Sequence, residues 1–364
     1  MTDPAPQSKP HDKPDRLPRY LALAWVILTV YGSLYPFTGW QTEGIDPFAF
    51  LQLAWPRYWT TFDLIANVVI YLPTGFLFTL ALRRLPGRLI APVLAILLAS
   101  LLSLTMESLQ TWLPSRFASV TDLGCNTLGA LFGALFACFI GGRLRPYWKH
   151  WRPRLMSQAS YVDMGLTLLG LWLLTLLSPE TLPLGVGDLR QTFSALPTLS
   201  YSLDTYRFME KIAVASNFLA VGLFFAAMTR GRWLAYLLTP LFFLLAALSS
   251  GLGAATLVGA DAFFAWLTPS VREGATLATP ILVVALLLPG TGRLILAALC
   301  LLVGTILVNL TPINPYSEVA LALWRQGHFL NFNGLTRWIS TVWPFCALPY
   351  LVFAARKGQA LASA

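Results

Sequence analysis

The feature that most constrains this chain is a succession of apolar runs, each about as long as a lipid bilayer is thick. A transmembrane helix needs about 20 predominantly apolar residues. Ten stretches come close to that requirement, at residues 18–38, 63–82, 89–113, 120–142, 160–178, 208–229, 233–254, 274–290, 293–310 and 338–355. The sequence therefore predicts an all-α fold, a polytopic integral membrane helical bundle of about ten transmembrane helices.

Composition supports a membrane protein and narrows the classes of partner and cofactor. Only 11% of the residues are charged, whereas a soluble domain carries about 25%. The net charge of +9 comes from basic clusters between apolar runs, so no nucleic-acid partner is expected. The four cysteines lie in apolar runs without a CxxC motif, and the three histidines are far apart. We therefore expect no disulfide, no metal and no cofactor.

The distribution of Lys and Arg predicts the orientation. Most of the 25 basic residues fall in alternate connections, which would be cytoplasmic if the N-terminus is inside: Lys9, Lys13, Arg16, Arg19, Arg83, Arg84, Arg88, Arg143, Arg145, Lys149, Arg152, Arg154, Arg230, Arg232, Arg293, Arg356 and Lys357. By the positive-inside rule, this pattern predicts that both termini are cytoplasmic. We expect the protein to lie in the bacterial inner (cytoplasmic) membrane.

The chain divides into four segments. Residues 1–16 are rich in Pro and charge and predict a disordered cytoplasmic tail. A four-helix membrane domain at 17–142 and a basic, aromatic cytoplasmic link at 143–159 follow, and 160–364 form a second membrane domain of about six helices. The link is either an interfacial segment with its aromatic residues at headgroup depth or a plain topological anchor. Residues 256–274, before the eighth run, could form a short re-entrant or interfacial piece.

Costly polar residues gather where three of the apolar runs meet the predicted outer surface. Each run carries two of them on one helical face, at spacings of three or four: Asp63 and Asn67, Glu107 and Gln110, Asp122 and Asn126. Tyr71 lies on the same helical face as Asp63 and Asn67, and Ser103 on the same face as Glu107 and Gln110. Arg116 lies in the loop between the runs 89–113 and 120–142. Gly129 and Gly133 continue the third face with small residues, which lets that helix press closely on a neighbour. Polar groups that face a bundle interior mark a functional site by default.

These residues carry a resemblance to a known family. The stretches "DLIANVVIYLPTG" (63–75), "SLTMESLQ" (103–110) and "SVTDLGCNTLGALFG" (119–133) resemble the signature blocks of the VanZ-like family, and "SLYPF" (33–37) resembles the element after its first helix. The resemblance covers about residues 20–142. The family takes its name from a membrane protein associated with low-level resistance to teicoplanin, a lipoglycopeptide antibiotic. It implies a role in the cell envelope without supplying a molecular activity.

We expect the polar residues to form an outer-leaflet groove that binds a lipid or a cell-envelope precursor headgroup. Its ligand-binding candidates are Asp63, Asn67, Glu107, Gln110, Arg116, Asp122 and Asn126. Glu107 and Asp122 are also the candidates for a catalytic acid or base, although no nucleophile, histidine or metal triad accompanies them. Membrane lipids and cell-envelope precursors are the expected partners.

Three other interpretations remain open. Asp63 and Asp122 could merely cap helices while Arg116 neutralises Glu107. The protein could be a structural or assembly partner of envelope or exopolysaccharide machinery, or an ion-coupled transporter. The aromatic outer segments 39–62 and 314–338 could cover the groove as lids, or simply form interfacial belts.

Overall fold

The computed structural model describes residues 16–41, 44–52, 60–178, 182–190, 199–257, 259–312 and 330–362. The predicted disordered tail, except for Arg16, lies outside these ranges, as do 42–43, 53–59 and 314–329 of the predicted outer segments. Ten α-helices and two short 3-10 helices make up the described chain: α1 (Leu17–Leu34), η1 (Ala49–Gln52), α2 (Thr61–Leu82), α3 (Ile90–Gln110), α4 (Val120–Leu155), α5 (Val162–Thr175), α6 (Leu203–Met228), α7 (Arg232–Leu257), η2 (Ala260–Ala262), α8 (Pro269–Ala285), α9 (Gly290–Leu310) and α11 (Leu330–Ala362). The all-α prediction is confirmed.

Eight helices of the described chain are long and apolar enough to cross a membrane, namely α1, α2, α3, α4 as far as Arg143, α6, α7, α9 and α11. The two that fall short are α5, with 14 residues, and α8, with 17. They lie at the fifth and eighth of the predicted spans. The stretch 256–274 contains η2 and the first turns of α8.

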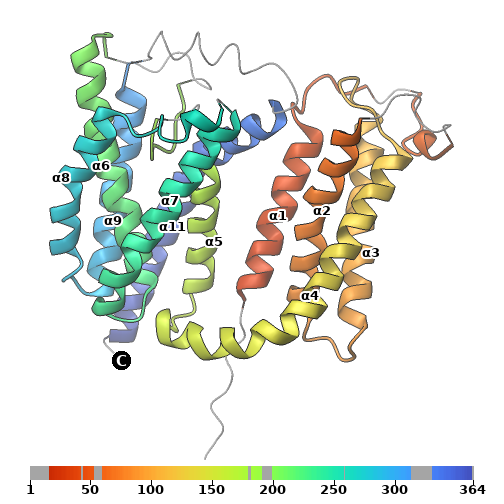
Figure 1. Ribbon diagram of the computed structural model, residues 1–364, viewed down its shortest axis with the longest axis horizontal. Helices are drawn as coiled ribbons and strands as arrows, with labels where there is room; N and C mark the ends of the chain where they lie inside the picture. The colour runs from red at the N-terminus through yellow and green to blue at the C-terminus, as the bar shows by residue number, and fades with distance from the viewer. Residues whose placement is uncertain are drawn as a thin grey trace, which may run out of the picture.

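The helices form two groups that α1 joins (Figure 1). In the first, α2, α3 and α4 pack on one another and α1 packs on α2 and α3. In the second, α6 packs against α7, α8 and α9, while α11 packs on α5 and α9. Helix α1 also contacts α5 and α11. The start of α1 and the end of α11 lie at the same end of the molecule, here called the proximal end, and the opposite end is the distal end (Figure 1).

Glycines bring the backbones of α2 and α4 into direct contact. A Cβ added at Gly133 would overlap the carbonyl oxygen of Leu72, and one added at Gly129 would overlap that of Val68. From the other side, a Cβ at Gly75 would overlap the carbonyl oxygen of Ala130. Small residues of this kind allow two helices in a membrane to approach closely. The predicted close packing of the Gly129–Gly133 face is therefore present, and its partner is α2.

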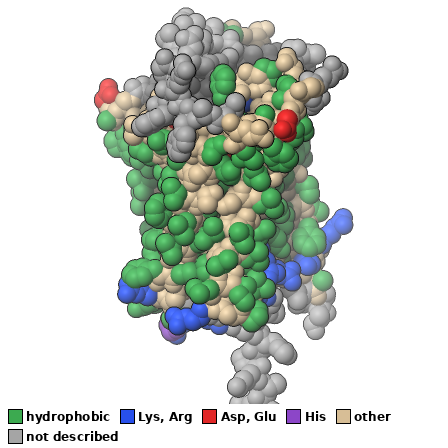
Figure 2. Space-filling model, turned by 90° about the vertical axis from the view of Figure 1, so that its right-hand side faces the viewer, with side chains coloured by type: hydrophobic (Ala, Val, Ile, Leu, Met, Phe, Trp, Pro, Cys, Tyr) green, Lys and Arg blue, Asp and Glu red, His purple; other side chains and the backbone are tan. Residues whose placement is uncertain are grey.

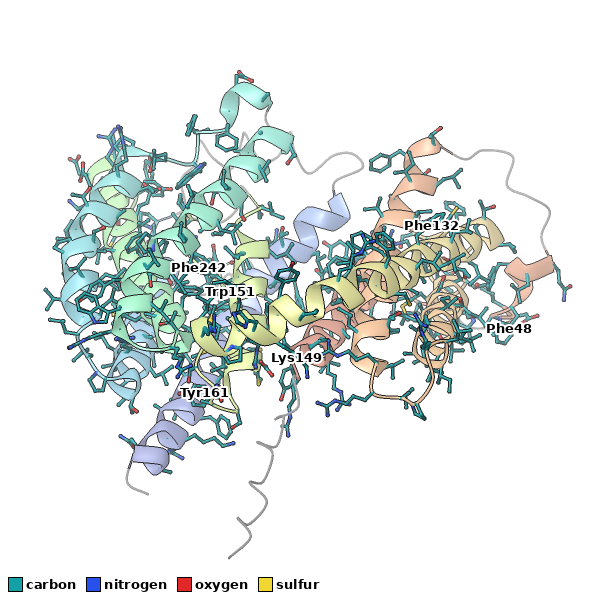
Figure 3. All side chains as sticks on the ribbon, turned by 60° about the horizontal axis from the view of Figure 1, so that its bottom comes forward. Phe48, Phe132, Lys149, Trp151, Tyr161 and Phe242 are labelled. Carbon is teal, nitrogen blue, oxygen red and sulfur yellow. The ribbon has the colours of Figure 1, made fainter. Side chains whose placement is uncertain are left out.

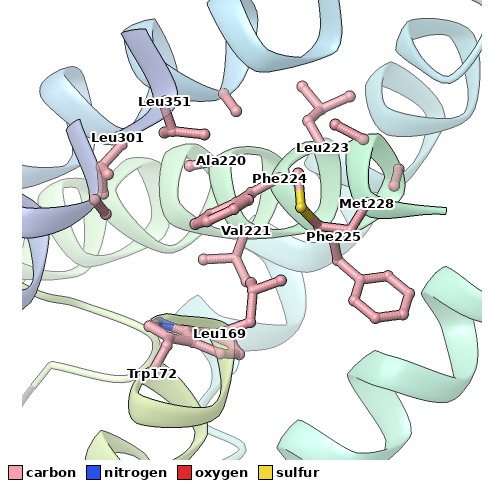
Figure 4. Close-up of a cluster of buried hydrophobic side chains, with 14 of the residues drawn as sticks. Leu169, Trp172, Ala220, Val221, Leu223, Phe224, Phe225, Met228, Leu301 and Leu351 are labelled. Carbon is pink, nitrogen blue, oxygen red and sulfur yellow. The ribbon is translucent and has the colours of Figure 1, made fainter. Parts of the chain in front are cut away.

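The core of the second group surrounds α6 (Figure 4). Trp172 of α5, Phe224 of α6 and Leu301 of α9 are each no more than 1% exposed. The same core contains a buried cation, Arg293, at the proximal start of α9. Its guanidinium donates to the carbonyl oxygens of Ala226 (3.1 Å), Leu286 (2.7 Å) and Leu288 (3.0 Å). Arg293 thus satisfies carbonyls at the C-terminal ends of α6 and α8, where the helix dipoles favour a positive charge.

A non-helical segment, residues 182–190, packs against α9 and α11, and its central residues 184–187 are buried. Gly187 N–H donates to the carbonyl oxygen of Ser340 (2.8 Å). The amide of Asn309 donates to Gly187 O (2.7 Å) and accepts from Leu189 N–H (2.9 Å). Because buried backbone groups must be hydrogen-bonded, irregular backbone inside a helix bundle needs partners of this kind.

Side-chain charge differs between the two ends of the molecule. On the face shown in Figure 2, apolar side chains form a broad middle band, with Lys and Arg at the proximal end and Asp and Glu at the distal end. Many large apolar residues of α2, α3 and α4 are exposed, including Leu97 (60%), Leu135 (56%) and Val69 (58%). A soluble protein would rarely expose so large an apolar surface, whereas lipid covers it in a membrane protein.

Candidate binding site at the distal ends of α2, α3 and α4

The distal starts of α2 and α4 are fixed by side-chain caps. Thr60 Oγ1 accepts from Asp63 N–H (3.1 Å) and donates to the Asp63 carboxylate (2.6 Å). Ser119 Oγ accepts from Thr121 N–H (3.1 Å) at the start of α4. Such caps satisfy backbone donors that the first helical turn leaves unpaired. The capping side chains are therefore Thr60 and Ser119 and not Asp63 and Asp122, which lie in the first turns of α2 and α4. The Asp63 side chain is exposed at the mouth of the site.

Glu107 lies deeper and is 4% exposed. Its Oε2 accepts a hydrogen bond from the backbone N–H of Ser119 (2.9 Å), which ties α3 to the start of α4. The Asp122 carboxylate of α4 is close enough to interact with Glu107, with Asp63 and with the side chain of Asn67. The close α2–α4 packing thus brings together carboxylates and an amide from three helices, as the helical spacing predicts.

Two polar atoms at the floor of the site lack a hydrogen bond of normal geometry. The amide of Asn126 donates to Ser103 Oγ (2.9 Å), which leaves its own carbonyl oxygen, Oδ1, unpaired. Tyr71 is 3% exposed, and its hydroxyl lies near Ser103 and Glu107 without a hydrogen bond of normal geometry. A buried polar group without a partner costs about 1–3 kcal/mol, so each one calls for an explanation.

Two of the predicted site residues are directed toward α1 instead. Gln110 Nε2 donates to the carbonyl oxygen of Ser33 (2.9 Å). The guanidinium of Arg116 donates to the carbonyl oxygens of Gly32 (3.1 Å) and Tyr35 (2.9 Å). Burial lowers the pKa of Arg116 from its usual value, although an arginine stays charged at neutral pH. Both side chains satisfy carbonyls at the end of α1 and so hold that helix against α3.

The structure adds Tyr71 and Ser103 to the site. Tyr71 follows Asn67 by four residues and Ser103 precedes Glu107 by four, so each shares a helical face with a predicted site residue. This spacing is visible in the sequence, but neither residue is charged, and neither was among the predicted ligand-binding residues. Together the two line the deepest part of the site.

The resulting site is a cluster of polar side chains, called the polar funnel for its graded exposure and not for a cavity, and it is defined as Asp63, Asn67, Tyr71, Ser103, Glu107, Asp122 and Asn126. Exposure falls along it, from an exposed Asp63 through the half-buried Asn67 and Asp122 to the buried residues beneath. Carboxylate and amide oxygens predominate, which favours a ligand that donates hydrogen bonds. Among the described residues, no three His, Cys, Asp or Glu side chains are placed to hold a metal ion.

The funnel residues lie in a region of the chain that matches a family model. Residues 20–141 match the model of the VanZ/LLP1 family, a range that covers nearly all of α1 to α3 and the membrane-crossing part of α4. Comparisons with curated proteins and with solved structures gave no match. The chain is thus a helical membrane protein with a VanZ-like N-terminal region, which confirms the resemblance seen in the sequence.

Proposed function

From this VanZ-like region we propose that the protein binds a lipid or cell-envelope precursor headgroup in the polar funnel, from the outer leaflet of the cytoplasmic membrane. The observation that carries the proposal is the pair of unpaired buried atoms, Tyr71 Oη and Asn126 Oδ1, at the floor of a funnel whose mouth is exposed. A bound headgroup would supply the partners that these atoms lack.

The proposal includes an orientation and a division of the chain. All ten helices would cross the membrane, including the shorter α5 and α8, with both termini in the cytoplasm and the distal end outside. The concentration of Lys and Arg at the proximal end in Figure 2 supports this orientation through the positive-inside rule. Helices α1–α4 would form the VanZ-like domain, and α5–α11 a second membrane domain.

The chemistry of the funnel indicates which part of a headgroup enters it. The oxygens of Glu107, Asp122 and Asn126 are acceptors and would repel a phosphate, whereas hydroxyl and ammonium groups donate hydrogen bonds. We therefore expect the sugar or amine part of a headgroup to occupy the funnel, with its phosphate at the membrane surface. Through the family resemblance, this binding would be linked to tolerance of lipoglycopeptides such as teicoplanin.

Conservative substitutions test this function. Glu107→Gln and Asp122→Asn preserve shape and remove charge, and Asp46→Asn is a matched control because Asp46 is an exposed carboxylate outside the funnel. We expect the two funnel variants to elute and melt like the parent. They should lose lipid or precursor retained in native mass spectrometry, together with any teicoplanin tolerance that the parent confers on a susceptible strain.

A structural role is the second candidate, because the Glu107–Ser119 and Asn126–Ser103 hydrogen bonds also tie the helices together. In that case the funnel variants would be recovered in lower amounts as folded protein, and the molecules that do fold would retain lipid like the parent. That result would contradict a binding site. An ion-coupled transporter would instead require flux through the reconstituted protein that depends on Glu107.

A further inference from the structure

The last part of α4 continues well beyond the membrane-crossing segment. The apolar span ends at Arg143, whereas the helix continues to Leu155. In Figure 1 this proximal arm, residues 144–155, turns away from the direction of the span and runs along the proximal end beneath α5. Pro146 lies within the helix at the start of the arm. Because a proline lacks the N–H that would bond four residues back, it permits such a bend.

The far end of the arm is fixed to the second helix group. Arg152 forms an ion pair with Asp163 of α5, and Asp163 also accepts from the backbone N–H of Arg16 (2.9 Å). Arg230, in the turn between α6 and α7, donates from its backbone to Leu155 O (2.9 Å) and from its side chain to Pro153 O (2.8 Å). The arm is therefore held in one place along the proximal surface, between the two helix groups (Figure 3).

Large aromatic side chains project from this fixed arm. Tyr147 is 66% exposed, Trp148 42% and Trp151 51%. Trp and Tyr at such positions favour the headgroup region of a bilayer, where the ring is shielded and the polar edge stays hydrated. Phe139 (62% exposed), one turn before the arm, continues the apolar surface of the span. The arm thus begins where the lipid-facing surface of α4 ends.

Positive charges accompany these aromatic residues. Lys149 and Arg154 are exposed, and the Arg154 guanidinium lies 5.7 Å from the centre of the Trp151 ring. Arg143 lies 4.3 Å from the centre of the Phe139 ring. An aromatic and basic helix in the plane of the membrane surface combines apolar insertion with attraction to negatively charged headgroups.

We infer that the proximal arm is a binding surface for anionic phospholipid headgroups. It lies in the leaflet opposite the polar funnel and does not depend on what the funnel binds. A lipid fits the arm better than an acidic protein partner does, because the arm continues from the end of the apolar span and exposes Tyr and Trp rings beside its cations. Lipid bound here would also contact the strip of protein that joins the two helix groups.

Lipid-specific quenching of tryptophan fluorescence tests the inference. The full-length protein is reconstituted into vesicles with either brominated phosphatidylglycerol or brominated phosphatidylcholine at the same mole fraction. The difference between the parent and a W148F/W151F variant gives the contribution of the arm. We expect stronger quenching of that contribution by phosphatidylglycerol. The preference should fall about fivefold for each cation removed in K149Q/R154Q and should weaken in high salt.

The control is R356Q/K357Q, which removes two exposed cations at the proximal end of α11. This control should keep the preference for phosphatidylglycerol. Equal quenching by the two lipids would overturn the inference. So would an equal loss of the preference for phosphatidylglycerol in K149Q/R154Q and in R356Q/K357Q. Absence of quenching by either lipid would also overturn it and would favour an acidic protein partner. Elution and melting of each variant show that it is folded, and none of these measurements depends on Glu107.

Discussion

The direct contact between α2 and α4 leads to a sharp prediction for Gly133→Ala. A Cβ at this position would overlap Leu72 O and lie only 2.8 Å from Phe76 N, both of them backbone atoms of α2. The added Cβ would lie 1.9 Å from Leu72 O. Nonbonded atoms prefer separations of about 3.5–4 Å, so the two helices would have to move apart by about 1.5–2 Å. A side chain could rotate away from the new methyl group, but the backbone of a helix cannot.

The expected cost follows from that rigidity. Overpacking a tight interior destabilises a protein by about 1–3 kcal/mol, and a clash with backbone should lie near the upper end. Gly142→Ala is a matched control on the same helix, because a Cβ there meets nothing within 4 Å. That control should gain about 0.5–1 kcal/mol from better helix propensity. Because that gain is common to both substitutions, the two alanine variants should differ in free energy of unfolding by the overpacking cost alone, about 3 kcal/mol.

Reversible unfolding in mixtures of SDS and a mild detergent, followed by tryptophan fluorescence, measures this difference. Gly133→Ala should unfold at a clearly lower SDS fraction than the parent, and Gly142→Ala at the same or a slightly higher one. Equal stability of the two variants would refute the close approach of α2 and α4. It would also remove the argument that this packing aligns Asn67 with Asp122.

Three other substitutions test contacts in the rest of the molecule. Arg293→Met leaves three helix-end carbonyls unpaired and should cost about 3 kcal/mol, whereas Arg356→Met at the exposed end of α11 should cost little; melting in detergent compares them. Asn309→Leu removes both hydrogen bonds to the buried segment 182–190 and should cost about 3 kcal/mol, so unchanged melting would contradict the described packing of that segment. Asp163→Asn should cost about 2 kcal/mol, and a double-mutant cycle with Arg152→Met should show that most of the loss belongs to their ion pair.

The sequence predicts the helices of this protein better than it predicts their ends. Apolar length located the spans, because lipid requires a continuous apolar stretch. Hydropathy falls after residue 142, and 143–159 was therefore predicted to be a link. In the structure α4 continues as a helix to Leu155, because an aromatic and basic segment can be helical at a membrane surface without being apolar. The end of a span is thus not the end of a helix.

The sequence also predicts only some of the contacts of the candidate site. Asp63, Asn67, Asp122 and Asn126 were predicted from helical spacing, and the structure brings them together at the distal ends of α2 and α4. The helical period could not show that Gln110 and Arg116 face α1, because their partners are backbone carbonyls. The spacing of side chains in a sequence does not show which backbone carbonyl oxygens will need a hydrogen-bond donor in the fold.

The sequence likewise does not predict contacts between backbone segments that are far apart along the chain. Residues 182–190 fall between two of the predicted spans, 160–178 and 208–229, where the sequence predicts only a connection. In the structure 184–187 are buried, and the amide of Asn309, 120 positions from Leu189 in sequence, satisfies the backbone groups of Gly187 and Leu189. A single asparagine in an apolar run gives no sign of which loop it will bind.

Helix α4 carries Asp122 in its first turn and Arg152 in its last, so one continuous element connects the funnel to the proximal arm. The connection is not stiff throughout, because Pro146 removes the backbone bond that would brace the helix at the start of the arm. The distal part of α4 can therefore tilt slightly by bending the helix at Pro146, without moving the proximal arm. The funnel and the proximal arm thus share a helix that a proline interrupts between them.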